Sequence, residues 1–128
     1  MSRRIAVLGS GSWGTALAIQ FARAGRETIM WGIETDEIAS MDKARCNTTY
    51  LPNAPFPDNL EVTVDFEEAL SGAEDVLVVV PSHAFRETMQ RLADSKVSVE
   101  HLAWATKGFE TDSGLLPHQV AQAVLGNS

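Results

Sequence analysis

The sequence contains the stretch Gly9-Ser10-Gly11-Ser12-Trp13-Gly14, with glycine at its first, third and sixth positions. The stretch follows a short apolar run at residues 4–8 and opens an alanine-rich segment at residues 15–24. A six-residue string of this kind is weak evidence by itself. Its place between a predicted strand and a predicted helix makes it typical of a Rossmann-type dinucleotide-binding unit.

Each glycine of this loop has a predicted task. Gly9 permits a tight turn, Gly11 lets a pyrophosphate approach the backbone, and Gly14 lets the helix pack against the strand. Free N–H groups and the positive end of the helix dipole would then hold the phosphates. The loop is therefore a candidate cofactor site, and a purely structural glycine-rich turn is the alternative.

Strand and helix patterns alternate along the rest of the chain. Apolar runs predict strands at 4–8, 27–31, 60–64, 76–80 and 101–105. Helical spacing predicts helices at 15–24, 34–45, 66–73, 85–93 and 116–124. Asp65 and Glu68 form a predicted capping box, and residues 46–59, with three prolines and three asparagines, predict a long irregular loop.

This order predicts an α/β fold with a doubly wound, mainly parallel sheet and helices on both faces. Ligands of such sheets bind beyond the carboxyl ends of the strands. Residues that follow strands are therefore the ones to search for a site.

The composition limits the classes of function. A chain of 128 residues fits one domain, and a net charge of −7 disfavours nucleic acid as a partner. Cys46 is the only cysteine, and no apolar run of membrane-spanning length or signal peptide is apparent, so a cytoplasmic location is expected. His83, His101 and His118 lack the spacing of metal ligands, so no metal site is expected.

Four segments carry a resemblance to a known family. They are Gly9-Ser-Gly-Ser-Trp-Gly-Thr-Ala-Leu-Ala18, Asn47 to Pro52 with Pro55 and Pro57, Val79-Val-Pro-Ser82, and Trp104-Ala-Thr-Lys-Gly108. With these segments in this order, the chain resembles the bacterial-type NAD(P)-dependent glycerol-3-phosphate dehydrogenases. The resemblance implies hydride transfer between sn-glycerol 3-phosphate and the nicotinamide of NAD or NADP. Dihydroxyacetone phosphate is the ketone, and the reaction serves phospholipid precursor synthesis.

The family pairs an N-terminal Rossmann domain with a C-terminal helical domain that carries the catalytic lysine. The resemblance therefore implies that residues 1–128 are a dinucleotide-binding domain, a fragment of a longer enzyme. The helical domain is absent from this chain. The general base is expected beyond residue 128, and the fragment alone is expected to be inactive. The expected partner is a small phosphorylated substrate, with no nucleic acid and no membrane span, and a homodimer of the full-length protein is an open alternative.

The resemblance also implies roles for single residues. Ser12 and Trp13 would contact the dinucleotide. Ser12 could also cap the helix, and both of its roles can hold at once. Trp13 could instead pack against neighbouring loops. Lys107 follows the last predicted strand and would contact both cofactor and substrate, with a solvated surface lysine as the alternative. Pro81 and Ser82 end a buried strand and should face the cleft, with a helix cap as the other role for Ser82. Asn47, Tyr50 and Pro52 match the family loop without a chemical task.

Position 33 departs from the family. Many relatives carry a basic residue or histidine there, near the adenosine ribose, whereas this chain has Ile33 followed by Glu34. An acidic side chain can accept hydrogen bonds from ribose hydroxyls and would repel a 2′-phosphate. The pair therefore favours NADH over NADPH, unless an arginine elsewhere, such as Arg45, offsets it.

Two other functions remain open at this level. The chain could belong to a related dehydrogenase acting on a different hydroxy acid or sugar nucleotide, although the segment Trp104 to Gly108 argues against this. It could also be a stand-alone module that binds NAD(H) for regulation without chemistry. A longer reading frame with a helical domain and a further lysine would favour the enzyme.

Overall fold

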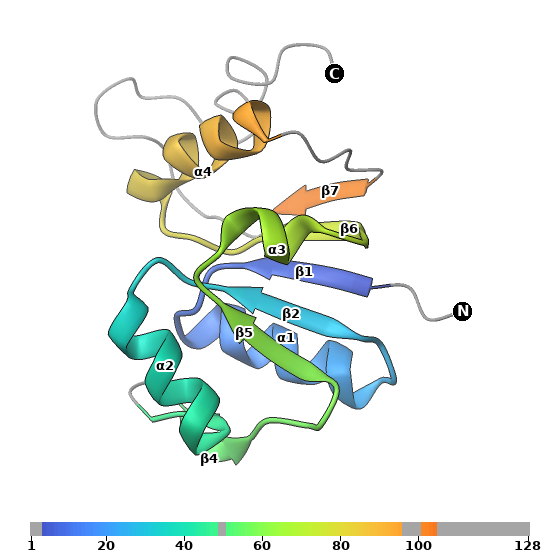
Figure 1. The fold of residues 1–128 in the computed structure, drawn as a ribbon, viewed down its shortest axis with the longest axis vertical. Coiled ribbons are helices and arrows are strands. Elements are labelled where there is room, and N and C mark those ends of the chain that lie inside the picture. The colour runs from blue at the N-terminus through green and yellow to red at the C-terminus, as the bar shows by residue number, and fades with distance from the viewer. Residues whose placement is uncertain (1–3, 49–50, 96–100, 105–128) are drawn as a thin grey trace.

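The computed structural model describes residues 4–48, 51–95 and 101–104. A five-stranded parallel sheet forms its centre, in the order β5-β2-β1-β6-β7 (Figure 1). Its strands are β1 (Arg4–Leu8), β2 (Thr28–Trp31), β5 (Leu60–Thr63), β6 (Ala73–Val78) and β7 (His101–Trp104). The helices are α1 (Ser12–Arg23), α2 (Thr35–Ala44), α3 (Phe66–Leu70) and α4 (Ser82–Asp94). The predicted doubly wound α/β fold is therefore confirmed.

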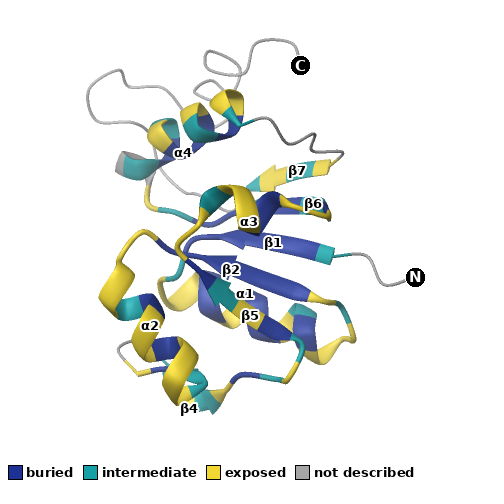
Figure 2. Cartoon of the chain, viewed as in Figure 1, coloured by how far each residue is buried: buried dark blue, intermediate teal, exposed yellow. Residues whose placement is uncertain are grey.

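The sheet is buried on both faces because alternate residues of β1 enter two separate apolar clusters. Ala6 and Leu8 pack with residues of α3 and α4, whereas Val7 packs with residues of α1 and α2. Figure 2 shows β1 and β2 almost wholly buried between the helices. Apolar side chains on both faces of a strand are what a parallel sheet covered by helices requires.

Several predicted boundaries need correction. Ala73 was expected to end a helix but is the first residue of β6, and that strand ends at Val78 rather than residue 80. In α4, the predicted inward residues are buried except Ala93, which is exposed. The last predicted helix, residues 116–124, lies outside the described residues.

The capping box at the start of α3 forms in one direction. The Asp65 side chain accepts a hydrogen bond from the Glu68 N–H at 3.1 Å. The Asp65 N–H donates to the Thr63 hydroxyl at 3.0 Å and not to Glu68. One half of the reciprocal pattern is enough to satisfy a free N–H of the first turn.

The segment predicted as a long irregular loop contains a second, small sheet. Its strands β3 (Cys46–Asn47) and β4 (Leu51–Pro55) pair antiparallel, with an irregular register between Cys46 and Asn47. The prolines of this segment lack an N–H, and proline is tolerated on a strand that has a free edge. A prediction based on proline and asparagine content was therefore wrong for these residues.

At the amino edge of the sheet, Asp75 of β6 joins two neighbouring segments. One carboxylate oxygen lies 2.7 Å from Arg26 Nη2, and the other lies 2.7 Å from His101 Nδ1. The hydrogen bond from Arg26 is the main cause that lowers the pKa of Asp75, and His101 adds to it against the opposing effect of burial. A lowered pKa means that the ionised carboxylate stabilises the fold above the ordinary aspartate pKa. This contribution is lost as the pH falls through the lowered value.

Candidate functional site

A cleft of about 300 Å³ lies at the carboxyl ends of β1, β2 and β6. In the sheet, β1 lies between β2 and β6. The chain runs from β1 outwards to β2 and β5 on one side and then returns to β6 and β7 on the other side, so the strand order reverses at β1. Ligands of open α/β sheets bind at such a switch point. The cleft is lined by the glycine loop, the residues after β2, the residues after β6, and one face of α4.

The glycine loop forms one wall of this cleft and has the geometry that its sequence predicts. Gly9 has φ of +137°, a conformation that side chains disfavour, and an added Cβ there would overlap the Val79 carbonyl oxygen. A Cβ on Gly14 would overlap the Gly9 carbonyl oxygen, so α1 approaches the loop closely. A Cβ on Gly11, in contrast, would meet no heavy atom within 4 Å. The loop is tight at Gly9 and Gly14 and open on the side of Gly11.

The start of α1 leaves its backbone donors free for a ligand. Gly11 is the N-cap and provides no side-chain hydrogen bond, and the first turn carries no acidic residue. The alternative role of Ser12 as the N-cap is therefore wrong, since Ser12 is the first helical residue. N–H groups at an uncapped helix start, with the positive end of the dipole, form a suitable environment for phosphate.

The residues after β2 also line the cleft. Ile33 is 57% exposed, and Glu34 is the exposed N-cap of α2. Two further carboxylates line the cleft, Glu37 of α2 and Glu87 of α4. This end of the cleft is therefore richer in acidic groups than Glu34 alone indicated.

An arginine that the sequence did not single out also lines the cleft. Arg91 Nη2 lies 3.3 Å from Glu87 Oε1, and its guanidinium carbon lies 5.5 Å from the centre of the Trp31 ring. The spacing of Glu87 and Arg91, one helical turn apart, was a usable signal for their pairing. Arg45, which was considered as an offsetting cation, instead donates to the carbonyls of Pro57 and Leu60 at 2.9 and 2.8 Å.

Residues of the β6–α4 connection complete the cleft. Val79, Val80 and Pro81 line it. Of these three, only Pro81 was expected to face the cleft, since Val79 and Val80 were predicted to lie within the strand. Pro81 is the N-cap of α4, so the predicted cap role of Ser82 is wrong and Ser82 begins the helix.

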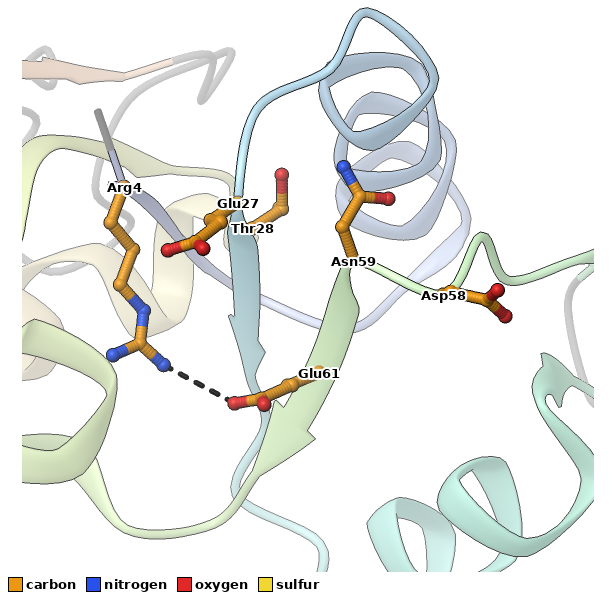
Figure 3. A pocket seen from close by; sticks show the side chains of 6 residues that line it. All are labelled: Arg4, Glu27, Thr28, Asp58, Asn59 and Glu61. Atoms are coloured by element: carbon orange, nitrogen blue, oxygen red, sulfur yellow. Dashed lines mark hydrogen bonds and ion pairs between the residues drawn. The ribbon is translucent and has the colours of Figure 1, made fainter. Parts of the chain in front are cut away.

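A second pocket of about 300 Å³ lies at the opposite, amino edge of the sheet (Figure 3). Its lining includes the carboxylates of Glu27, Asp58 and Glu61, and its arginine, Arg4, is paired with Glu61 at 3.3 Å. Three carboxylates against one paired cation make an unfavourable site for an anionic ligand. The cleft at the carboxyl edge is the better candidate.

Comparison with known proteins assigns the chain to a family. A family model described as the N-terminus of NAD-dependent glycerol-3-phosphate dehydrogenase matches residues 4–128. The chain belongs to this family. The resemblance inferred from the four sequence segments is therefore confirmed.

Individual members of the glycerol-3-phosphate dehydrogenase family are similar over almost the whole chain. A glycerol-3-phosphate dehydrogenase (NAD(P)+) of Thioalkalivibrio sulfidiphilus is 51% identical over 122 residues, 95% of this chain and 37% of that protein. One of Xanthomonas campestris is 47% identical over 127 residues, 99% of this chain and 37% of that protein. The chain therefore spans somewhat more than a third of the length of these relatives.

Solved structures of the glycerol-3-phosphate dehydrogenase family share the fold. The crystal structure of glycerol-3-phosphate dehydrogenase from Coxiella burnetii has a TM-score of 0.87 and 42% identity, and it matches 98% of this chain and 38% of that one. The enzyme from Saccharomyces cerevisiae has a TM-score of 0.80 at 23% identity, which supports the fold alone.

Two residues that the family resemblance selects, Ser12 and Trp13, lie at the start of α1. Ser12 is exposed in the first turn of α1, and Trp13 beside it is 65% exposed. Such exposure argues against the alternative of Trp13 packed into neighbouring loops, within the part of the chain that the structure describes. Lys107 lies outside the described residues.

Among the residues that the structure describes, no group of three or more His, Cys, Asp or Glu side chains could hold a metal ion. No helix within the described ranges is long and apolar enough to cross a membrane.

Proposed function

We propose that residues 1–128 are the dinucleotide-binding domain of a longer NAD(P)-dependent enzyme that interconverts sn-glycerol 3-phosphate and dihydroxyacetone phosphate. The observation that carries this proposal is the cleft at the switch point of the sheet, with open space on the Gly11 side of the loop. Membership of the family supports this choice of substrate, since the relatives from Thioalkalivibrio sulfidiphilus and Xanthomonas campestris are both named glycerol-3-phosphate dehydrogenase.

The residues present fit a dinucleotide. The pyrophosphate would lie against Gly11, where no heavy atom would meet even an added Cβ. The free N–H groups of the first turn of α1 would donate to its oxygens. Ile33 and Glu34 would flank the adenosine ribose, and the exposed indole of Trp13 would cover part of the cofactor. When bound, the cofactor supplies the hydride acceptor or donor at its nicotinamide ring.

The remaining chemistry is assigned to residues that the structure does not describe. By the family resemblance, Lys107 would contact both the cofactor and the substrate phosphate or reacting oxygen. The general base would come from a helical domain beyond residue 128. We place the enzyme in the cytoplasm, with a small phosphorylated substrate as partner; a net charge of −7 supports the expectation that it does not bind nucleic acid. A homodimer of the longer protein remains a prediction.

The chain should bind NADH without catalysing turnover. A calorimetric titration measures binding, and a steady-state assay with dihydroxyacetone phosphate and NADH measures activity. Absence of binding would refute the proposed function. Turnover in the usual enzyme range of about 1–10³ s⁻¹ would refute the need for a second domain.

Ile33→Arg should shift the cofactor preference towards NADPH by about tenfold. The wild-type chain should favour NADH by about tenfold, because Glu34, Glu37 and Glu87 outnumber Arg91 along this part of the cleft. Two unit charges about 4 Å apart interact by about 1 kcal/mol in water and about 4 kcal/mol at an effective dielectric of 20. The interaction energy of charges at the exposed rim of the cleft should be nearer the lower value. A difference of about 1.4 kcal/mol corresponds to tenfold in affinity.

A matched control separates local from global charge. Ala24→Arg adds the same charge at an exposed position just beyond the far end of α1 and should leave the NADPH/NADH ratio of dissociation constants unchanged. The prediction is wrong if wild type binds NADPH tenfold more tightly than NADH. It is also wrong if Ile33→Arg gives NADPH no advantage beyond that of the control.

A further inference from the structure

A buried amide lies directly beneath the glycine loop. Asn47 of β3 is 1% exposed, and its Nδ2 group donates to the Ser10 carbonyl oxygen at 3.0 Å and to the Thr15 hydroxyl at 2.8 Å. The contact joins residues 37 positions apart in the chain. The small β3–β4 sheet therefore supports the loop through one side chain.

The Thr15 hydroxyl completes the arrangement. Thr15 is fully buried, and its Oγ1 atom lies 3.3 Å from the Ser10 carbonyl oxygen. With Asn47 donating to this hydroxyl, its own proton is available for the Ser10 carbonyl or for the sulfur of Met30, 3.6 Å away. The carbonyl of Ser10 is therefore held towards buried donors.

Fixing this carbonyl also fixes the direction of the next N–H group. In a planar trans peptide the C=O and the N–H point in opposite directions. No peptide bond in the described structure is cis. With the Ser10 carbonyl directed to the interior, the Gly11 N–H points away from it, on an exposed residue that lines the cleft.

We infer that Asn47 is a positioning residue that orients the Ser10–Gly11 peptide and so aims the Gly11 N–H at the pyrophosphate of a dinucleotide. This inference rests on the proposed function. Asn47 is not among the residues that line the cleft, and it acts on the loop through its hydrogen bond to Ser10. When the Gly11 N–H is already oriented in the free protein, binding requires less loss of conformational entropy. Removing Asn47 should therefore weaken the affinity for ligands that carry a pyrophosphate.

The chain offers a matched control in Asn59. Its Nδ2 group likewise donates two hydrogen bonds, in this case to the backbone carbonyls of Ala22 and Arg26, at 2.8 and 2.9 Å. Asn59 lies in the pocket at the amino edge of the sheet, beside the end of α1 (Figure 3). Asn59→Ala therefore removes a similar pair of hydrogen bonds away from the cleft.

The test compares dissociation constants for NADH and for adenosine in wild type, Asn47→Ala and Asn59→Ala, at a temperature where all three are folded. Asn47→Ala should weaken NADH binding by about tenfold to a hundredfold. This is the effect of losing one hydrogen bond to a charged group, here the bond from the Gly11 N–H to the pyrophosphate. Binding of adenosine, which has no pyrophosphate, should change by less than about twofold. Asn59→Ala should lower the thermal midpoint without changing either affinity.

Equal NADH affinity in wild type and Asn47→Ala, or equal losses for NADH and adenosine, overturns the positioning role while leaving the proposed function intact. A wild-type chain that does not bind NADH refutes the proposed function itself. If Asn47→Ala does not fold, Thr15→Val and Thr15→Ser replace it. Weaker NADH binding in Thr15→Val, with wild-type affinity in Thr15→Ser, which keeps the hydroxyl, supports the role. Equal NADH affinity in the two variants, whether at the wild-type value or weaker, overturns it.

Discussion

Gly11→Val should raise the dissociation constant for NADH by at least about a hundredfold, equivalent to about 2.7 kcal/mol. The two methyl groups would fill the open space beside Gly11, where the pyrophosphate should meet the backbone. The fold should tolerate the change, because Gly11 has φ of −74° and an added Cβ meets no heavy atom within 4 Å. Replacement of a glycine N-cap should cost no more than about 1 kcal/mol of unfolding free energy.

Calorimetry gives the affinity and urea unfolding followed by circular dichroism gives the stability. Gly11→Ala serves as the graded control, since its single methyl group should weaken binding less than valine. A valine variant that is folded and binds NADH like wild type would show that this loop is not the phosphate site.

Gly9→Ala should destabilise the fold by about 3 kcal/mol or more, the sum of backbone strain and steric overlap. Gly9 adopts φ of +137°, and a Cβ there would overlap the Val79 carbonyl oxygen where the loop crosses the end of β6. The Cβ is fixed to the Gly9 backbone and the carbonyl belongs to the Val79 backbone, so no flexible side chain could move aside to relieve the overlap. A loss of this size is a large part of the about 5–15 kcal/mol that stabilises a typical domain.

Gly25→Ala is the control for this second prediction. Gly25 also has a positive φ, +92°, but an added Cβ would meet no heavy atom within 4 Å. Its alanine variant should therefore show only the backbone strain, about 1–2 kcal/mol. Urea midpoints measure both variants, and a Gly9→Ala loss no larger than that of Gly25→Ala would contradict the predicted overlap.

The sequence predicted the fold well because its signals are local. The glycine loop lies between a short apolar run and a helix, and β1 and α1 form there. Alternating strands and helices then left few arrangements, since right-handed crossovers are strongly preferred. Gly25 lies just after the end of α1 with a positive φ, as expected of a glycine beyond a helix C-terminus.

The support beneath the loop could not be predicted in the same way. Asn47 matched a family segment, but its contact with Ser10 depends on how β3 and β4 fold back against α1. That arrangement arises from packing between distant segments and leaves no periodic pattern in the sequence. The same holds for Arg45, which was considered as a cation that could offset the NADH preference but whose guanidinium binds the carbonyls of Pro57 and Leu60.

Part of the cleft's charge was also hidden from sequence reasoning. The inward stripe of α4 was read correctly from Phe85, Met89 and Leu92, which are all buried. The stripe does not reveal that Glu87 and Arg91 border the cleft, because that depends on how α4 lies across the sheet. Periodicity identifies the buried face of a helix, whereas tertiary packing decides what the remaining faces meet.

The most direct test of the central claim is a titration of the ¹⁵N-labelled chain with NADH, followed by the backbone amide chemical shifts. The account predicts that the shifts concentrate at residues 9–14, 32–34 and 79–81, which surround the cleft at the carboxyl edge. The chemical shifts of amides beside the amino-edge pocket, such as those of Glu27, Asn59 and Glu61, should not change. Shifts confined to that pocket, or no saturable shifts at all, would contradict the account.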